Sequence, residues 1–353
     1  MDNLTVIASK KNWIDTRSVE ALEKITRFKG VKKVVGLPDL SVGVVPNGMA
    51  VLSKDRIYPH LIGGDIGCGM SLFEVSLKPK KIKVDRFAKY LSKIDSLDDV
   101  EIDTPYLGYS LGSIGRGNHF AELHLVNEIE DRVLFEKIGC KAESLYVLIH
   151  SGSRSFGQMV FDKVAGRYNP FEGLSPKEAK EYLINHDKAI SLAKQSRQEI
   201  VKRLLKAIKV EADMTTISDT AHNSILKTKD GWLHRKGATP TDMGAVIIAG
   251  SRGSLSYLVV PTEDTKKSNY SLAHGAGRKW ERNSAEAKLK NHYTKTDLTR
   301  TNIGSRVLCQ DSKLLYEEAP QAYKNIDIVI SDLVEEGLVK VVATFRPILT
   351  YKE

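Results

Sequence analysis

Short runs of apolar residues, each followed by a turn that contains glycine or serine, recur along this chain. The clearest runs have the sequences VKKVVGL (31–37), ESLYVLIH (143–150) and AVIIAG (245–250). A continuous apolar run of this length, bounded by turn residues, is typical of a buried strand. No internal repeat is visible, so the pattern argues against a solenoid or repeat array.

A helical period appears near the start of the chain, in the sequence DTRSVEALEKITRFKG (15–30). Asp15 or Thr16 can cap the first turn, and Gly30 is placed to end the helix. Apolar residues recur on one face of this segment, at Val19, Leu22 and Ile25. This spacing predicts an amphipathic helix with one buried face.

A longer helical block is predicted from about Ser175 to Val210. Its apolar stripe consists of Ile190, Ala193, Ile200, Leu204 and Ile208. Basic residues lie beside the stripe, at Lys194, Arg197, Lys202, Arg203 and Lys206. Because the helix face opposite a core is usually charged, we interpret these cations as solvated surface rather than an RNA contact. The basic run LKPKKIKVDRFAKYLSK (77–93) is interpreted in the same way.

No proline- or serine-rich linker divides the 353 residues, and the residues with candidate chemistry are spread from position 65 to position 274. A single site assembled from such distant segments predicts one domain. We therefore expect an α+β fold, a single large mixed domain over residues 1–353 with a helical insertion at about 175–210.

Composition narrows the setting of the protein. Three cysteines are too few for a disulfide framework, and the start of the chain, MDNLTVIASKKNW, has no long apolar run. No stretch approaches the roughly 18 apolar residues of a membrane span. We expect a cytoplasmic protein with no membrane partner. The net charge of +9 suits a phosphate-rich partner such as RNA, but it also suits solubility alone, and charge leaves both open.

The sequence GGDIGCGM (63–70) places one carboxylate and one thiol among four glycines. One interpretation is a tight turn with a small buried thiol, because free cysteine is often buried and inert. The other is that Asp65 and Cys68 are metal ligands on a backbone that leaves room for an ion. This motif alone does not decide between them.

Four of the nine histidines shift the balance toward metal binding, because each occupies a turn or the end of a strand-like run. They are His119 (GRGNHFAEL), His150 (YVLIHSGSRSFG), His222 (SDTAHNS) and His274 (LAHGAGRKW). An aspartate, a cysteine and three imidazoles exceed the needs of one tetrahedral ion with an open position. They suit two ions bridged by the Cys68 thiolate, an arrangement that serves phosphoryl displacement. Ligand softness alone favours zinc.

His274 has a different environment, since it precedes Gly275 and Gly277 and is followed by Arg278. Small residues let backbone amides approach phosphate oxygens, and a guanidinium can pair with them in bidentate fashion. A neutral imidazole is also a usable nucleophile at neutral pH. The sequence IAGSRGSLSY (248–257) supplies a second turn suited to phosphate or ribose contacts.

These motifs together resemble the RtcB family of RNA ligases. The resemblance runs from about residue 36 to the C-terminus and is carried, in the family's order, by GGDIGCGM, GRGNHFAEL, IHSGSRSFG, AHN, RKGAT, GSRGSLSY, AHGAGR, EEAPQAYKN and RPILTYKE. It implies a GTP-dependent ligase that joins an RNA 3′-phosphate or 2′,3′-cyclic phosphate to a 5′-hydroxyl, in RNA repair or tRNA splicing.

The resemblance also implies site residues. Asp65, Cys68 and His119 would hold one Mn²⁺, Cys68, His150 and His222 the other, and His274 would become guanylylated. The family's use of manganese replaces the preference for zinc. The GTP site would be lined by Asn118, Glu122, Asn223, Gly250, Ser251, Arg252, Ser256, Gly275, Ala276 and Gly277. Tyr323 and Lys352 would contact guanine.

The chain departs from the family pattern at Ser41, where histidine is usual, at Arg252, where methionine is usual, and around Trp280. These departures indicate a short divergent branch and leave the RNA-end preference, the pathway, the oligomeric state and any protein partner open. Two other functions remain: a dinuclear-metal phosphoesterase acting on RNA ends, and a non-catalytic RNA-binding paralogue. The phosphoesterase has no use for a nucleophilic His274, and the paralogue predicts a damaged site, whereas every proposed ligand is present.

Overall fold

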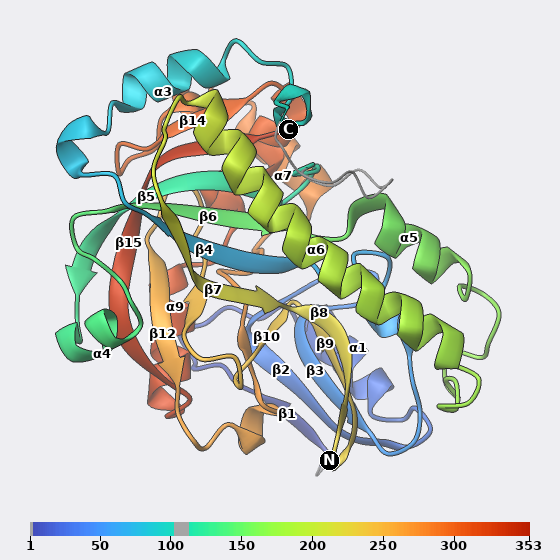
Figure 1. Cartoon of the computed structure of the whole chain (residues 1–353). Helices are drawn as coiled ribbons and strands as arrows, with labels where there is room; N and C mark the ends of the chain where they lie inside the picture. Colours follow the sequence, from blue (N-terminus) through green and yellow to red (C-terminus); the bar gives the residue numbers. More distant parts are fainter. Residues whose placement is uncertain (1–2, 102–112) are drawn as a thin grey trace.

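The computed structural model describes residues 3–101 and 113–353, and its largest element is an eight-stranded, mostly antiparallel sheet (Figure 1). Along this sheet the strands follow the order β11 (Val246–Ile248), β12 (Ser256–Pro261), β15 (Val339–Lys352), β5 (Phe120–Ile129), β6 (Leu145–Ser151), β4 (Gly69–Val75) and β7 (Met214–Ala221), and β14 (Arg306–Cys309) pairs in parallel with β15.

A second sheet of five strands lies beside the first. Its order is β1 (Leu4–Val6), β2 (Val31–Ser41), β3 (Asn47–Ser53), β9 (Gly231–Lys236) and β8 (Asn223–Thr228), and a separate pair is formed by β10 (Ala238–Pro240) and β13 (Ser271–Ala273). The chain crosses from one sheet to the other at His222, the single residue between β7 and β8. Side chains at this crossing can therefore face both sheets.

Helices pack on the two sheets and on one another. They are α1 (Thr16–Ile25), α2 (Pro59–Ile62), α3 (Val84–Leu91), α4 (Arg132–Lys137), α5 (Arg154–Asp162), α6 (Lys180–Ala207), α7 (Arg282–Leu289), α8 (Ser312–Glu317) and α9 (Ile326–Glu335). Short 3-10 turns occur at Pro79–Lys81, Leu97–Asp99, Lys266–Ser268, Asp297–Thr299 and Pro320–Ala322. None of the helices in the described ranges is both long enough and apolar enough to cross a bilayer.

The hydrophobic pattern predicted these elements well. The three apolar runs form parts of β2, β6 and β11, and the mixture of helices and strands confirms the α+β class. The N-terminal helix is α1, and Asp15 caps it by accepting a hydrogen bond from the Arg17 amide. We predicted that Gly30 ends this helix, and that prediction is wrong. Gly30 lies in the turn before β2 with a φ of +73°, because the helix already stops at Ile25.

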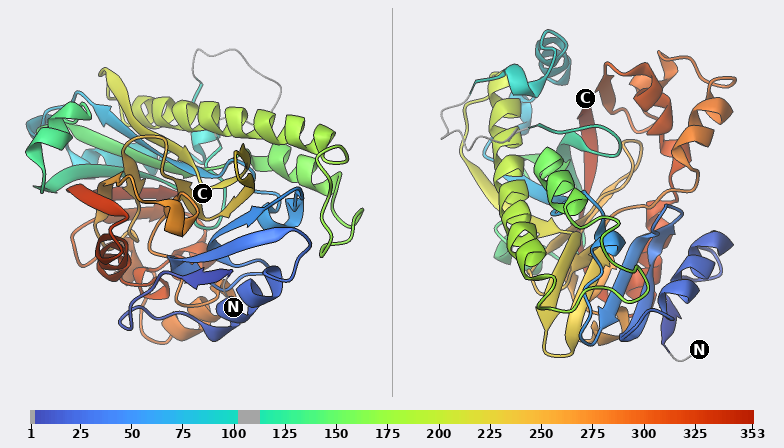
Figure 2. Two further views of the ribbon diagram at one scale, coloured as in Figure 1. Left: turned by 90° about the horizontal axis from the view of Figure 1, so that it is seen from below. Right: turned by 90° about the vertical axis from the view of Figure 1, so that its right-hand side faces the viewer.

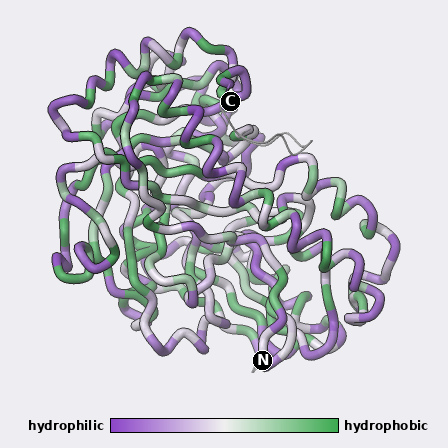
Figure 3. The backbone as a smooth tube through the Cα atoms, viewed as in Figure 1, coloured by the Kyte–Doolittle hydropathy of each residue, from purple (hydrophilic) through white to green (hydrophobic). Residues whose placement is uncertain are grey.

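The predicted helical block is α6, which crosses the outer face of β4, β6 and β7 (Figures 1 and 2). Along it the tube in Figure 3 alternates between hydrophobic and hydrophilic colours. Ile200, Leu204 and Ile208 are buried in a core with side chains of β4 and β6. That this helix is an insertion into a single domain stays a prediction.

The interpretation of the basic residues of α6 as solvated surface is wrong for Arg197, which is 1% exposed. Its Nη1 donates to the carbonyl oxygens of Gly67 and Ser151, each at 3.0 Å. Its Nη2 donates to Asp219 Oδ1 at 2.7 Å, and Nε donates to Ser71 Oγ at 2.7 Å. A guanidinium can be buried at this position because its donors meet these acceptors.

We expect Arg197→Met to lower the free energy of unfolding by about 3–5 kcal/mol, because it leaves the buried Asp219 carboxylate without its partner. Chemical denaturation measures the change. The double variant Arg197→Met/Asp219→Asn should recover part of the loss, and Lys202→Met, at an exposed position of the same helix, should stay within about 0.5 kcal/mol of the parent. Equal stabilities for the Arg197 and Lys202 variants would contradict this role.

Candidate active site

The glycine-rich loop between α2 and β4 carries Asp65 and Cys68 to the place where the two sheets meet. Gly67 has a φ of +74°, and a Cβ there would lie 2.9 Å from the Ile190 Cα in α6. Only glycine fits this conformation and this close approach. The glycine next to the thiol therefore lets the loop rest directly on α6.

Strand register then brings the histidines to Cys68. His150, the penultimate residue of β6, pairs with Met70 of β4. Phe120, which directly follows His119, pairs with His150 from the other side. On the other side of β4, Gly69 pairs with Ala221, so His222 follows at the same end of the sheet. Antiparallel pairing thus places residues that are far apart in sequence at one edge.

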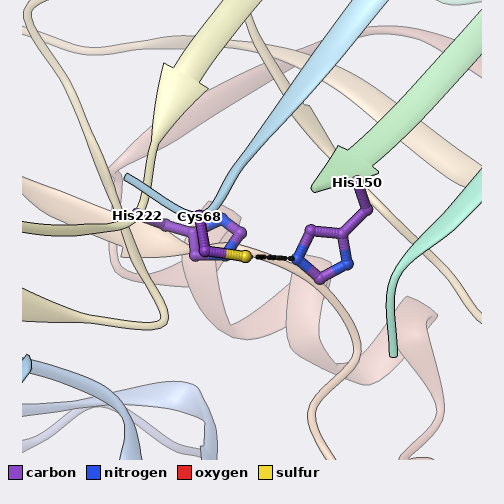
Figure 4. A group of neighbouring side chains, drawn as sticks. All are labelled: Cys68, His150 and His222. Carbon is purple, nitrogen blue, oxygen red and sulfur yellow. Dashed lines mark hydrogen bonds between the residues drawn. The ribbon is translucent and has the colours of Figure 1, made fainter. Parts of the chain in front are cut away.

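The resulting cluster contains two overlapping groups of donor atoms, each within 4.8 Å: Cys68 with His150 and His222, and Asp65 with Cys68 and His119. Figure 4 shows the first group, with the Cys68 sulfur directed at the His150 ring. Cys68 Sγ lies 3.2 Å from Nε2 of both His150 and His119. Cys68 is the member shared by the two groups, as the bridging hypothesis requires.

The donor set suits divalent cations in its chemistry, and two of its histidines also suit them in protonation. Burial lowers the pKa values of His150 and His222 well below the ordinary value, so both rings are neutral and can coordinate. His150 Nδ1 lies 3.0 Å from the Asn118 carbonyl oxygen, which fixes the proton there and leaves the Nε2 lone pair toward the cluster. Burial and Asp65 raise the pKa of Cys68, so cation binding would release the thiol proton.

Arg154 adds a contact to this cluster that the sequence did not predict. Its Nη1 lies 3.0 Å from Nδ1 of His119, and its backbone has a φ of +54°. A guanidinium only donates, so this contact makes Nδ1 the acceptor and leaves the N–H proton of the neutral ring on Nε2. Metal coordination through Nε2 therefore requires the contact to rearrange or that proton to be lost.

His274 lies next to the cluster, directly after β13. Its ring centroid is 4.5 Å from that of His222 and 6.3 Å from that of His150. Nδ1 lies 2.6 Å from Oδ2 of Asp39, a fully buried residue of β2, and the same oxygen accepts the His274 amide at 3.1 Å. With the ring proton held on Nδ1, the lone pair of Nε2 is free.

Asp39 was missed by sequence reasoning, although a signal was present. It stands in the segment PDLSVG (38–43), two residues before Ser41, the departure from the family pattern. A buried aspartate in a strand without a visible basic partner in sequence indicates a contact made in the tertiary structure.

A cavity of about 460 Å³ joins these residues to the predicted nucleotide loops. It is lined by Asp65, Cys68, His150, His222 and His274 together with Asn118, Glu122, Asn223, Gly250, Ser251, Arg252, Gly275, Ala276, Gly277, Tyr323 and Lys352. Ser256 does not line the cavity. Its Oγ accepts the Gly250 amide at 3.1 Å and so supports the turn from behind.

The part of the cavity near Lys352 has a mixed charge. Burial lowers the pKa of Lys352 to about 8, and Glu318 opposes that effect. Glu122 is hydrogen bonded to His124 at 2.8 Å and to Thr350. Glu318, which sequence reasoning passed over although it belongs to the motif EEAPQAYKN, accepts from Tyr323 and from Arg278. Buried donors and acceptors of both signs are suited to a ligand with a polar edge.

The departures from the family pattern occupy different places. Ser41 and Arg252 both line the cavity. Trp280 lies outside it, where Lys288 Nζ is 4.7 Å from the ring centroid. The first two departures therefore bear on the candidate site directly.

Comparison with known proteins matches residues 104–353 to the family described as "tRNA-splicing ligase RtcB". The chain is 42% identical to "RNA-splicing ligase RtcB2" of Escherichia coli, and the alignment covers 99% of this chain and 96% of that protein. It is 29% identical to "tRNA-splicing ligase RtcB" of Nanoarchaeum equitans, over 97% and 91% of the two chains. With the protein of that name from Archaeoglobus fulgidus it shares 31% identity over 67% and 58%.

We expect Cys68→Ala to lower metal affinity at both groups by more than about a hundredfold. The reason is that removing a ligand shared by both groups lowers the affinity more than removing a residue that only holds a ligand in place. His119→Ala and His150→Ala should each affect mainly one group. Elemental analysis after loading with Mn²⁺ and desalting measures the content, and Cys140→Ala, a buried cysteine in a separate core cluster, is the matched control. Two tightly held ions in the Cys68→Ala protein would contradict bridging.

Proposed function

The chain belongs to the RtcB family, and on that premise we propose that it is a GTP- and Mn²⁺-dependent RNA ligase. It joins an RNA 3′-phosphate or 2′,3′-cyclic phosphate end to a 5′-hydroxyl end, in RNA repair or tRNA splicing. RNA and GTP are its substrates, and two Mn²⁺ ions are its cofactors. The net charge of +9 agrees with a polyanionic substrate.

One observation carries the proposal: the imidazole of His274, with its Nε2 free, lies beside the two groups of candidate metal ligands. Asp39 holds its Nδ1 at 2.6 Å, and its ring lies against that of His222. A phosphoesterase needs the metal ligands but has no use for an oriented histidine with a free Nε2 in a glycine-lined cavity. The arrangement therefore favours group transfer through a histidine.

The cations have a matching set of ligands in this chain. Asp65, Cys68 and His119 would hold one ion, and Cys68, His150 and His222 the other. When bound, the two ions neutralise charge on the phosphates and orient the attacking and leaving groups in line. Manganese is proposed over zinc from the family resemblance, since thiolate and imidazole ligands by themselves favour zinc.

In the first step Nε2 of His274 attacks the α-phosphorus of GTP. The new P–N bond forms as the bond between the α-phosphorus and the oxygen that bridges to the β-phosphorus breaks, and pyrophosphate leaves. Asp39 stabilises the imidazolium character that develops, because its carboxylate accepts the Nδ1 proton throughout.

In the second step an oxygen of the RNA 3′-phosphate attacks the guanylyl phosphorus, and the P–N bond to His274 breaks. A 2′,3′-cyclic end must first take up water to give this 3′-phosphate. In the third step the 5′-hydroxyl oxygen attacks the phosphorus of the RNA 3′-phosphate, its proton is lost to solvent, and GMP leaves. His274 returns to its neutral state with the proton still on Nδ1.

The glycines after His274 let the phosphates of GTP come close to the backbone. Gly277 has a φ of +70°, and a Cβ there would lie 2.2 Å from the Asp39 carbonyl oxygen. The turn thus requires glycine both for its conformation and for its approach to β2. Lys352 and Tyr323, which both line the cavity, are proposed to contact the guanine base.

We expect protein incubated with α-labelled GTP and Mn²⁺ to become covalently labelled, with label that is lost in mild acid as a phosphoramidate requires. His274→Ala should abolish both labelling and ligation while leaving metal content unchanged, and it should still join an RNA whose 3′ end is already guanylylated. The control His292→Ala removes an exposed histidine and should be labelled normally. Label retained in His274→Ala, or found on a lysine, would show that another residue is the nucleophile.

We expect Asp39→Asn to slow guanylylation by a factor on the order of 10³ to 10⁴ without loss of metal, because an amide that donates to Nδ1 moves the ring proton to Nε2. Single-turnover labelling measures the rate. Asp332→Asn, which also neutralises a buried carboxylate, controls for the loss of charge. Equal labelling rates for the parent and Asp39→Asn would mean that Asp39 does not set the tautomer.

A further inference from the structure

Asp39 lies in a stretch of β2 where the pairing with the neighbouring strands lapses. The register of β2 against β3 shifts between Gly36 and Ser41, so residues 37–40 have no paired residue in β3. On the other side, β1 pairs with β2 only as far as Gly36. An irregularity of this kind can turn a side chain toward a site, but it leaves main-chain carbonyl groups that other donors must satisfy.

A lysine from a distant part of the chain meets these carbonyl groups. Lys324 lies just after the 3-10 turn Pro320–Ala322 and is 8% exposed. Its Nζ donates to the carbonyl oxygens of Pro38, at 3.0 Å, and of Leu40, at 2.7 Å, which are the residues on either side of Asp39. Carbonyl groups two residues apart in an extended chain point to the same side, so one ammonium can reach both.

The main chain of the same lysine holds the turn that carries the candidate nucleophile. The Lys324 amide donates to the carbonyl oxygen of Gly277 at 3.0 Å, three residues after His274. Lys324 therefore contacts both sides of the pair formed by Asp39 and His274. It holds the strand through its ammonium and the turn through its amide.

The ammonium also supplies a positive charge beside a buried carboxylate. Asp39 is fully buried, and Lys324 is close enough for the two charges to interact. Burial lowers the pKa of Lys324 to about 8, whereas Asp39 and Asp332 raise it, so the ammonium keeps its proton at neutral pH. A carboxylate buried away from water is costly unless a cation lies near it.

We propose that Lys324 is a positioning residue for His274. It holds Asp39 where Oδ2 accepts the Nδ1 proton of His274, and so keeps Nε2 as the attacking atom. Lys324 does not line the cavity, so it acts through Asp39 and not on a substrate. The inference rests on the proposed function, because the step that it serves is the guanylylation of His274.

Proton NMR of the metal-free protein tests the positioning before any nucleotide is added. The proton between Nδ1 of His274 and Oδ2 of Asp39, which lie 2.6 Å apart, should give a downfield signal that is absent in His274→Ala. Lys324→Met removes the charge and both donors, and it should shift or remove this signal. Lys33→Met is the matched control, because Lys33 also belongs to β2 and also donates to two carbonyl oxygens. It should leave the signal in place.

Single-turnover labelling with α-labelled GTP and Mn²⁺ measures the consequence for the reaction. We expect Lys324→Met to slow labelling about ten- to a hundredfold, because displacing a reacting group by about 1 Å costs up to about a hundredfold in rate. Metal content, and the joining of an RNA whose 3′ end is already guanylylated, should stay at the level of the parent. A general loosening of the site would lower both. Lys324→Gln, which keeps a donor without the charge, should also label more slowly and serves if the methionine variant does not fold.

A double variant shows whether Lys324 acts through Asp39. If it does, Lys324→Met/Asp39→Asn should be labelled no more slowly than Asp39→Asn alone, because both changes disturb the same hydrogen bond. Multiplied losses in the double variant would mean that the two residues act independently, and they would overturn the inference.

The outcomes separate the inference from the proposed function. If GTP labels the parent and Lys324→Met at equal rates, the inference is wrong and the proposed function stands. If Lys324→Met changes the NMR signal but GTP labels neither protein, Lys324 still positions the His274 ring and the proposed function fails.

Discussion

The buried guanidinium of Arg197 is the interaction on which the arrangement of the candidate site depends. It reaches from α6 to the carbonyl oxygen of Gly67, directly before Cys68, and to that of Ser151, directly after His150. Asp219 of β7 balances its charge at 2.7 Å. One side chain therefore fixes the main chain beside two candidate ligands. Its charge can be buried because these acceptors satisfy its donors.

The junction of the two sheets gives the site its chemistry. The large sheet supplies His150 at the end of β6, the second sheet supplies Asp39 in β2, and His222 stands where the chain passes between them. His274 is held from one sheet while it faces groups that belong to the other. A cavity between two packed sheets can hold a candidate nucleophile, candidate metal ligands and nucleotide loops in a fixed relation.

Sequence reasoning found the residues of this cluster because their chemistry is unusual in glycine-rich turns. Cys68 and the four histidines were recognised from residue type and local setting, and β6 and α6 from their hydrophobic pattern. The residues that it missed act through contacts across the fold. Asp39 contacts a histidine 235 positions away, and Glu318 accepts from Arg278, which is 40 positions away.

The sequence by itself determined the kinds of element, their approximate bounds and the identity of the chemical groups, because these follow from local periodicity and residue type. The tertiary structure decided which charged groups are buried and which of them are satisfied. Arg197 has the sequence setting of a surface cation, yet it is buried, since burial depends on acceptors that come from three other segments of the chain. Such pairings are set by strand register and helix packing, which no local pattern encodes.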